Sequence, residues 1–151
     1  LDTSRGLGDV YKRQVYYSVK ALINNGRVYS TDVCLPISKI TECVNFAEAQ
    51  TKKLGLRAPM VGHLGDGNFH VILPYDPKEE GTYNKIRDFS DLLIEKTLEL
   101  NGTITGEHGV GLHKKAYLLK EHGDCIPLMK SIKRSIDQNN IMNPGKIFDL
   151  N

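Results

Sequence analysis

The sequence predicts an α+β fold: an antiparallel sheet covered by helices in a ferredoxin-like, split βαβ arrangement, followed by C-terminal helices and an extended tail. The order of the predicted elements carries this prediction, because strand–helix–strand–strand–helix–strand is the order of that motif. The chain has 151 residues, of which 40% are hydrophobic. That length is enough for one domain with a hydrophobic core.

Turn residues and apolar spacing place the elements in the first half of the chain. A short helical pattern ends at a turn signal, Asn24, Asn25 and Gly26. β-branched and aromatic residues then form a predicted strand, and a helix begins at Pro36 and ends at Gly55. Two further strands flank a glycine-rich turn. These elements span residues 15–23, 27–35, 36–54, 58–62 and 68–73.

The second half is predicted from helical periodicity. A long helix ends at Asn101 and Gly102 in the usual left-handed conformation. A short strand and two helices follow, and Pro144 and Gly145 then lead into an extended tail. Four residues of the last helix are expected to face the protein interior: Ile126, Met129, Ile132 and Ile136. The elements span residues 79–100, 103–107, 113–121 and 126–138.

The first fourteen residues, LDTSRGLGDVYKRQ, show no apolar period. They resemble the adaptor-derived leader that is translated at the end of some assembled transcript fragments. We therefore expect a non-native leader at 1–14 and a single domain at 15–151.

Composition excludes several classes of partner. The 20 basic and 18 acidic side chains nearly balance and form no basic run, so neither a nucleic-acid nor a membrane partner is expected. No stretch approaches the roughly 20 apolar residues of a membrane span. The three cysteines form no CxxC pair, which argues against a cysteine zinc site or a redox dithiol. We expect buried, reduced thiols.

Two histidines flank one tight turn in the segment HLGDGNFH. Gly65 and Gly67 supply the backbone freedom that such a turn needs, so a hairpin brings His63 and His70 together. Paired imidazoles bind divalent ions through neutral nitrogens. The alternative is a turn with two structural histidines.

A carboxylate and an imidazole are adjacent in the glycine-rich segment TGEHGVG. Glycines on both sides allow the close approach of a ligand or of other backbone. A nucleotide-binding loop is rejected, because Glu107 would repel phosphate and the glycine order is not that of the dinucleotide-binding fingerprint.

Together, His63, His70 and Glu107 form a ligand set suited to zinc or manganese, with open positions for water or substrate. His108 then remains as a base beside the ion, able to take a proton from a bound hydroxyl. If hydride leaves the same centre, a flavin or nicotinamide must accept it, and the chain has no usual phosphate cradle for either. Two alternatives are a metal-dependent hydrolase and a non-catalytic α+β binding module.

Four segments resemble the C-terminal half of FAD-linked oxidases of the D-lactate dehydrogenase, glycolate oxidase and D-2-hydroxyglutarate dehydrogenase group. They are YSTDVCLPISKI from Tyr29, GHLGDGNFHVIL from Gly62, NGTITGEHGVGLHKK from Asn101 and IMNPGKIF from Ile141. The first is most similar to the mitochondrial, cytochrome-linked D-lactate dehydrogenase type. The resemblance covers residues 15–151 in the family's order.

The resemblance implies a role for each matching residue. His63, His70 and Glu107 match the family's metal ligands, and His108 matches its catalytic base. Asn68 matches a position near the substrate. Asn143 matches a tail that contacts the flavin domain, with an ordinary Asn-Pro turn as the alternative, whereas His113 and Lys114 are expected to be solvated helix-start residues.

The resemblance also implies an activity for the intact protein. That activity is oxidation of a D-2-hydroxyacid, above all D-lactate, by FAD with a zinc or manganese ion, with an electron acceptor such as cytochrome c in mitochondria. The family's FAD-binding domain and its substrate-carboxylate arginine fall outside the matching residues. Arg5 and Arg13 lie in the leader and are not assigned that role. We therefore expect this chain alone to be inactive.

Overall fold

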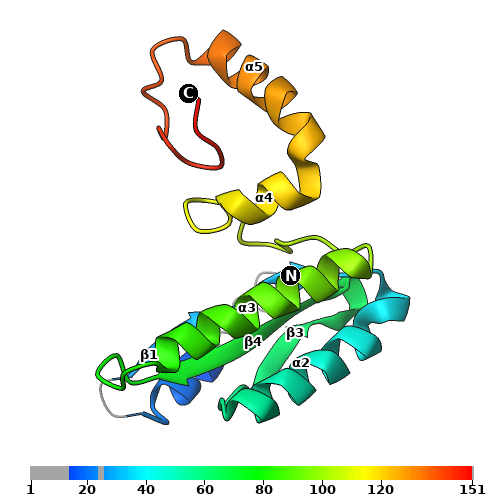
Figure 1. The fold of residues 1–151 in the computed structure, drawn as a ribbon, viewed down its shortest axis with the longest axis vertical. Coiled ribbons are helices and arrows are strands. Elements are labelled where there is room, and N and C mark those ends of the chain that lie inside the picture. Colours follow the sequence, from blue (N-terminus) through cyan, green and yellow to red (C-terminus); the bar gives the residue numbers. More distant parts are fainter. Residues whose placement is uncertain (1–13, 24–25, 151) are drawn as a thin grey trace, which may run out of the picture.

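The computed structural model describes residues 14–23 and 26–150. It confirms the α+β class: helices α2 (Ile40–Leu54) and α3 (Thr82–Glu99) pack on one face of an antiparallel sheet (Figure 1). All but the last residue of the predicted leader lies outside the described residues. Within the described part, no helix is both long and apolar enough to cross a membrane.

The longest strand, β4 (Asn68–Tyr75), is the centre of the sheet. Strands β1 (Arg27–Ser30) and β2 (Val33–Cys34) follow one another along one edge of β4, and β3 (Met60–His63) pairs with the other. All pairs are antiparallel. A bridge between Cys34 and Thr103 brings the chain after α3 beside β2. This is the strand order of a split βαβ fold.

The remaining helical segments are short, and two helices lie in the C-terminal part. They are α4 (Lys115–His122) and α5 (Ile126–Ile136), with a 3-10 turn (Gly123–Cys125) between them; further 3-10 turns span Ile37–Lys39 and Leu64–Asp66, and residues 14–20 are helical. As predicted, Gly55 ends α2 with a left-handed φ of 68°. Asn101 takes the same conformation after α3, at a φ of 59°.

The main core lies between the sheet and the two long helices. Phe69, Val71 and Leu73 alternate along β4 and are at most 1% exposed. They pack with buried residues of both helices, among them Cys43, Ala47, Ile86, Phe89 and Leu93. Because side chains alternate along a strand, Asn68, His70 and Ile72 face the other side of the sheet. That opposite face carries the candidate site.

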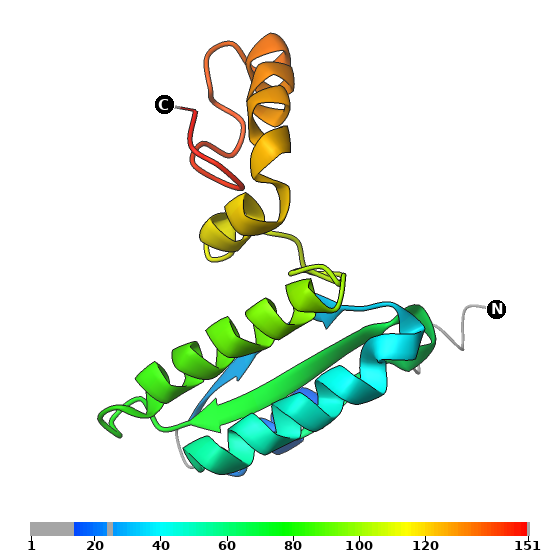
Figure 2. The same ribbon diagram turned by 45° about the vertical axis from the view of Figure 1, so that its right-hand side comes forward.

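A smaller core joins α3 to the C-terminal part. It is formed by Ile94, Ile104 and Leu118, with Phe148 of the tail packed against it. Figures 1 and 2 show α4, α5 and the tail extending away from one end of the sheet as a separate arm. The backbone N–H of Ile147 donates to the Gly111 carbonyl at 2.7 Å, so the tail is tied to the loop that precedes α4.

Two predicted strands were wrong in part. The strand expected at 27–35 is interrupted between β1 and β2, where the Asp32 side chain is buried. The strand expected at 103–107 is reduced to the single bridge at Thr103. The physical reason is the same in both cases: backbone N–H groups after Thr105 donate to the Asp32 carboxylate instead of to a neighbouring strand.

Three expectations for the C-terminal part and the cysteines were also wrong. Ile132 and Ile136 of α5 are 51% and 73% exposed rather than inward. The tail is not extended, because Asn140, Asn143, Gly145 and Ile147 have positive φ, and Asp137 accepts the N–H groups of Ile141 and Met142. All three cysteines are free thiols, but only Cys43 is buried: Cys34 is half-buried and Cys125 exposed.

Candidate active site

The hairpin places both predicted histidines on one face of the sheet. His63 at the end of β3 pairs with Asn68, and Val61 pairs with His70, so the side chains of these four residues point the same way. His70 is 8% exposed, whereas His63 is exposed at the strand end. Gly67 is required in the turn: at its φ of 80°, a Cβ would lie 2.1 Å from the Leu35 carbonyl oxygen.

The His70 ring is held by two oxygens. Its Nδ1 lies 2.9 Å from the Thr31 carbonyl oxygen, and its Nε2 lies 2.9 Å from Oε1 of Glu107. A carbonyl oxygen only accepts hydrogen bonds, so Nδ1 keeps a proton and donates it to Thr31. Nε2 is therefore the atom that can bind a ligand, oriented through Nδ1 as metal-binding histidines commonly are.

The loop that carries Glu107 is fixed by Asp32. The two carboxylate oxygens accept the backbone N–H groups of Gly106 at 3.1 Å, Glu107 at 3.2 and 3.3 Å, and His108 at 3.0 Å. The Thr105 hydroxyl donates a further bond at 3.1 Å. One buried carboxylate thus positions both predicted functional residues of the loop.

Lys114 completes this buried network. Its Nζ donates to the carbonyl oxygens of Asp32 at 3.0 Å and Ile104 at 2.8 Å, and lies 3.4 Å from Oδ2 of Asp32. The expectation that Lys114 is solvated was wrong: its side chain is 19% exposed. Burial lowers the pKa of Lys114, and the negative charge of Asp32 opposes that shift.

The pKa of Asp32 is held well below its usual value. Burial alone would raise this pKa. The backbone N–H of His108, the amide of Asn68 and the positive charge of Lys114 outweigh that effect. Asp32 is therefore a carboxylate at any physiological pH.

Asn68 also belongs to this network. Its Nδ2 donates to Oδ1 of Asp32 at 2.9 Å and to the Val33 carbonyl at 3.1 Å. Its buried Oδ1 has no hydrogen-bond partner among the described residues. The amide lies against Gly106, where a Cβ would come within 1.9 Å of Nδ2. The geometry favours a role in positioning the loop, and the contact with substrate stays a prediction.

His108 projects from the fixed loop into solvent. Its side chain is 65% exposed, and its Nε2 lies 3.7 Å from Oε1 of Glu107. The rings of His70 and His108 are 5.4 Å apart between centroids. An exposed imidazole on an immobilised backbone is suited to accept a proton from a bound molecule.

These residues surround one cavity of about 540 Å³. His63, His70, Glu107 and His108 all line it. Apolar side chains of the sheet and of the helical segment at 14–20 form much of the remaining wall, namely Val15, Tyr16, Val61 and Ile72, and Ser30 and Gly62 complete it. Its volume is in the range of small-molecule sites.

The donor set fits a divalent cation. Among the described residues, one group has ligand atoms that all lie within 4.8 Å of one another: Asp32, His70 and His108. The oxygens of Asp32 are already occupied by N–H groups and by Lys114. Nε2 of His70 and Oε1 of Glu107 lie 2.9 Å apart, close enough to share one ion, and their role as ligands stays a prediction. His63 lines the same cavity but is not in the close group, so its role as a ligand stays a prediction.

Asp32 and Lys114 are the site residues that the sequence analysis missed. A signal for Asp32 exists: it is an acidic residue within a stretch of strand-forming residues, where charge is rare unless it is paired. Asn143 lies in the tail on the C-terminal arm, and its predicted contact with flavin is not tested by this geometry.

The fold and the site define an α+β domain with a histidine–carboxylate centre facing an open cavity. The chain belongs to the family of FAD linked oxidases, C-terminal domain, whose model matches residues 11–147. This match includes every residue of the cavity wall named above.

Curated relatives agree with that family. The chain is 39% identical over 140 residues to the "Probable D-lactate dehydrogenase, mitochondrial" of Danio rerio, covering 92% of this chain and 28% of the relative. It is 34% identical over 138 residues to the "D-lactate dehydrogenase [cytochrome], mitochondrial" of Arabidopsis thaliana (91% and 24%). It is 38% identical over 120 residues to "Glycolate oxidase subunit GlcD" of Bacillus subtilis (78% and 25%). The chain thus spans about a quarter of the length of these relatives.

Proposed function

We propose that the intact protein is an FAD-dependent dehydrogenase that oxidises a D-2-hydroxyacid, D-lactate above all, to the 2-oxoacid. The observation that carries the proposal is the fixed pair of His70 and Glu107 with the exposed imidazole of His108 beside it. Family membership supports FAD as the cofactor, and the names of the relatives support a 2-hydroxyacid substrate.

In this proposal each site residue of the chain has a separate role. His70 and Glu107, with His63, would hold a zinc or manganese ion, and His108 would accept the proton of the substrate hydroxyl. Asp32 keeps His108 in place through the backbone N–H. When bound, the ion supplies Lewis acidity at the substrate oxygens and FAD supplies the hydride acceptor.

The cavity wall supports a small substrate. Val61 and Ile72 lie beside His70, and neither lysine nor arginine is among the described residues that line this cavity. An apolar wall accommodates the methyl group of lactate, whereas a second carboxylate would lose hydration without gaining a cationic partner. This supports D-lactate over D-2-hydroxyglutarate.

Partners and location rest on the relatives alone. Relatives in Arabidopsis thaliana and Saccharomyces cerevisiae carry both "cytochrome" and "mitochondrial" in their names. We propose a cytochrome such as cytochrome c as the electron acceptor and a mitochondrial location. We also propose that the chain by itself does not turn over a 2-hydroxyacid, because it spans about a quarter of its relatives and the family resemblance implies a separate FAD-binding domain.

The test is flavin reduction in the full-length protein that contains this chain, measured without oxygen. D-lactate is expected to reduce the flavin faster than L-lactate or D-2-hydroxyglutarate. His108→Ala should lower the reduction rate about 10²–10⁴-fold and leave the bound metal unchanged. His122→Ala, an exposed histidine at the end of α4, is the matched control and should change little. Near-normal reduction in His108→Ala contradicts the assigned role.

A further inference from the structure

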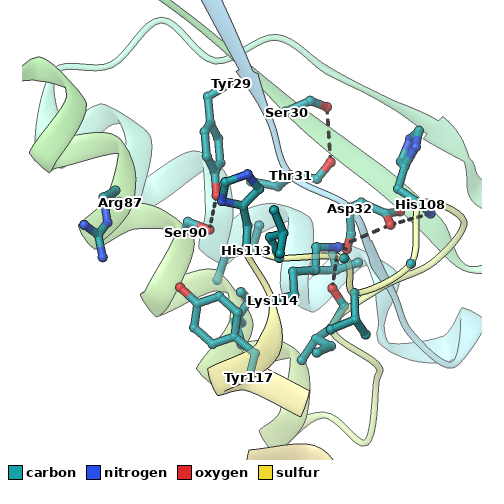
Figure 3. A pocket seen from close by; sticks show the side chains of 18 of the residues that line it. Tyr29, Ser30, Thr31, Asp32, Arg87, Ser90, His108, His113, Lys114 and Tyr117 are labelled. Atoms are coloured by element: carbon teal, nitrogen blue, oxygen red, sulfur yellow. Dashed lines mark hydrogen bonds and ion pairs between the residues drawn. The ribbon is translucent and has the colours of Figure 1, made fainter. Parts of the chain in front are cut away.

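A second cavity, of about 580 Å³, lies between α3 and the loop at 108–114 (Figure 3). Tyr29 of β1 and Ser90 of α3 line it, with a hydroxyl–hydroxyl distance of 3.2 Å. Arg87 stands on α3 and His113 on the facing loop. We propose that this cavity binds a small organic carboxylate.

This cavity is distinct from the candidate active site. His63, His70 and Glu107 line the first cavity and not the second. The two share Ser30 and His108, so β1 and the loop form the wall between them. The inference is independent of the proposed dehydrogenase activity.

Two donors in the second cavity are without a hydrogen-bond or ion-pair partner in the part of the chain that the structure describes. Arg87 and His113 form no hydrogen bond or ion pair with any other described residue. Asp91 lies one turn after Arg87, but its carboxylate already accepts the Tyr117 hydroxyl. A guanidinium and an imidazole on opposite walls are therefore available to a ligand.

The charges that line the cavity favour an anion. Arg87, His113 and Lys114 are potential cations there, and Asp32 is the acidic residue among the lining residues. The Asp32 charge is balanced by Lys114 and by the loop N–H groups. Glu107, whose negative charge argues against a phosphate-binding loop, lines the other cavity and not this one.

The remaining walls indicate the kind of anion. Leu93, Ile94 and Ile104 supply apolar surface, which suits an organic group rather than a bare inorganic ion. A guanidinium binds a carboxylate through two parallel hydrogen bonds. The Tyr29 and Ser90 hydroxyls and the His113 ring add further donors.

The test is an NMR titration of the ¹⁵N-labelled chain with sodium succinate, compared with sodium chloride at equal ionic strength. Saturable shifts are expected for Tyr29, Ser90 and residues 109–114 with succinate but not with chloride. The His108 amide should shift as well, because His108 lines both cavities.

Two variants make the test specific. Arg87→Met should weaken succinate binding at least about tenfold, and it breaks no hydrogen bond or ion pair among the described residues. Lys85→Met, an exposed lysine on the same helix that lines neither cavity, should leave the affinity unchanged. Absence of saturable shifts at about 50 mM succinate, a concentration that detects even very weak binding, overturns the proposal. Equal affinity in Arg87→Met and the unaltered chain overturns it too.

Discussion

The carboxylate of Asp32 accepts the backbone N–H of His108 at 3.0 Å, across 76 positions of sequence. Neither group is expected to do chemistry itself, yet their bond sets where the His108 imidazole stands relative to Glu107. The site therefore depends on a buried ionic network as much as on the residues that face the cavity. This dependence leads to measurable expectations for stability and for metal binding.

Removing the Asp32 charge should destabilise the fold. Asp32→Asn leaves the buried Lys114 ammonium without its counter-charge and places an amide N–H₂ against N–H donors of the loop. We expect a loss of about 3 kcal/mol in the free energy of unfolding, measured by urea denaturation.

The same denaturation experiment can measure how much the ion pair between Asp32 and Lys114 contributes to stability. In a double-mutant cycle with Lys114→Met, the losses from the two substitutions should add up to more than the loss in the double variant, because Lys114→Met removes the uncompensated charge. Strict additivity would show that Asp32 and Lys114 contribute independently.

The depressed pKa of Asp32 gives the fold an acid-sensitive contribution. In the unfolded chain this carboxyl titrates near pH 4, and in the fold its pKa lies lower because the N–H of His108, Asn68 and Lys114 outweigh the effect of burial. The unfolded state thus binds a proton first, so the stabilisation is complete above about pH 4 and is lost as the pH falls further.

The measurement is the difference in unfolding free energy between the unaltered chain and Asp32→Asn at several pH values. Other carboxylates with lowered pKa, such as Asp137, titrate in both proteins and cancel. The difference should shrink as the pH falls below about 4. A difference that is constant with pH would show that the Asp32 charge does not stabilise the fold.

A methyl group at Gly106 should disrupt the loop. A Cβ there would lie 1.9 Å from the Asn68 amide nitrogen and 2.9 Å from an Asp32 oxygen. Gly106→Ala is expected to cost about 1–3 kcal/mol of stability. Gly65→Ala is the control, since its Cβ would meet nothing within 4 Å. Equal thermal stability of the two variants would contradict the close approach.

Divalent metal should bind through His70 and Glu107. Calorimetric titration of the chain with zinc or manganese is expected to give one strong site, weakened at least about tenfold in His70→Ala and in Glu107→Gln. His63→Ala should also weaken it if the predicted three-residue set is correct. Glu99→Gln, an exposed carboxylate at the end of α3, serves as the control. Unchanged affinity in Glu107→Gln would exclude that residue as a ligand.

Local sequence patterns were sufficient to predict much of the fold. The ends of α2 and α3 at Gly55 and Asn101 follow from backbone preferences of single residues, and the β3–β4 hairpin follows from its glycine-rich turn. Local patterns gave a wrong prediction where a side chain far away in the sequence accepts the backbone N–H groups of a segment. The segment after Thr103 has the composition of a strand, but its N–H groups bind Asp32.

The sequence by itself determined the α+β class and singled out the residues that are proposed to bear the chemistry, His63, His70, Glu107 and His108. Periodicity, turn preference and ligand chemistry are properties of neighbouring residues. Only the tertiary structure decided that Asp32 and Lys114 hold the loop, that α5 leaves an apolar face exposed and that a second cavity forms beside Arg87. Those features arise from burial and charge pairing between segments far apart in the chain, which no local pattern records.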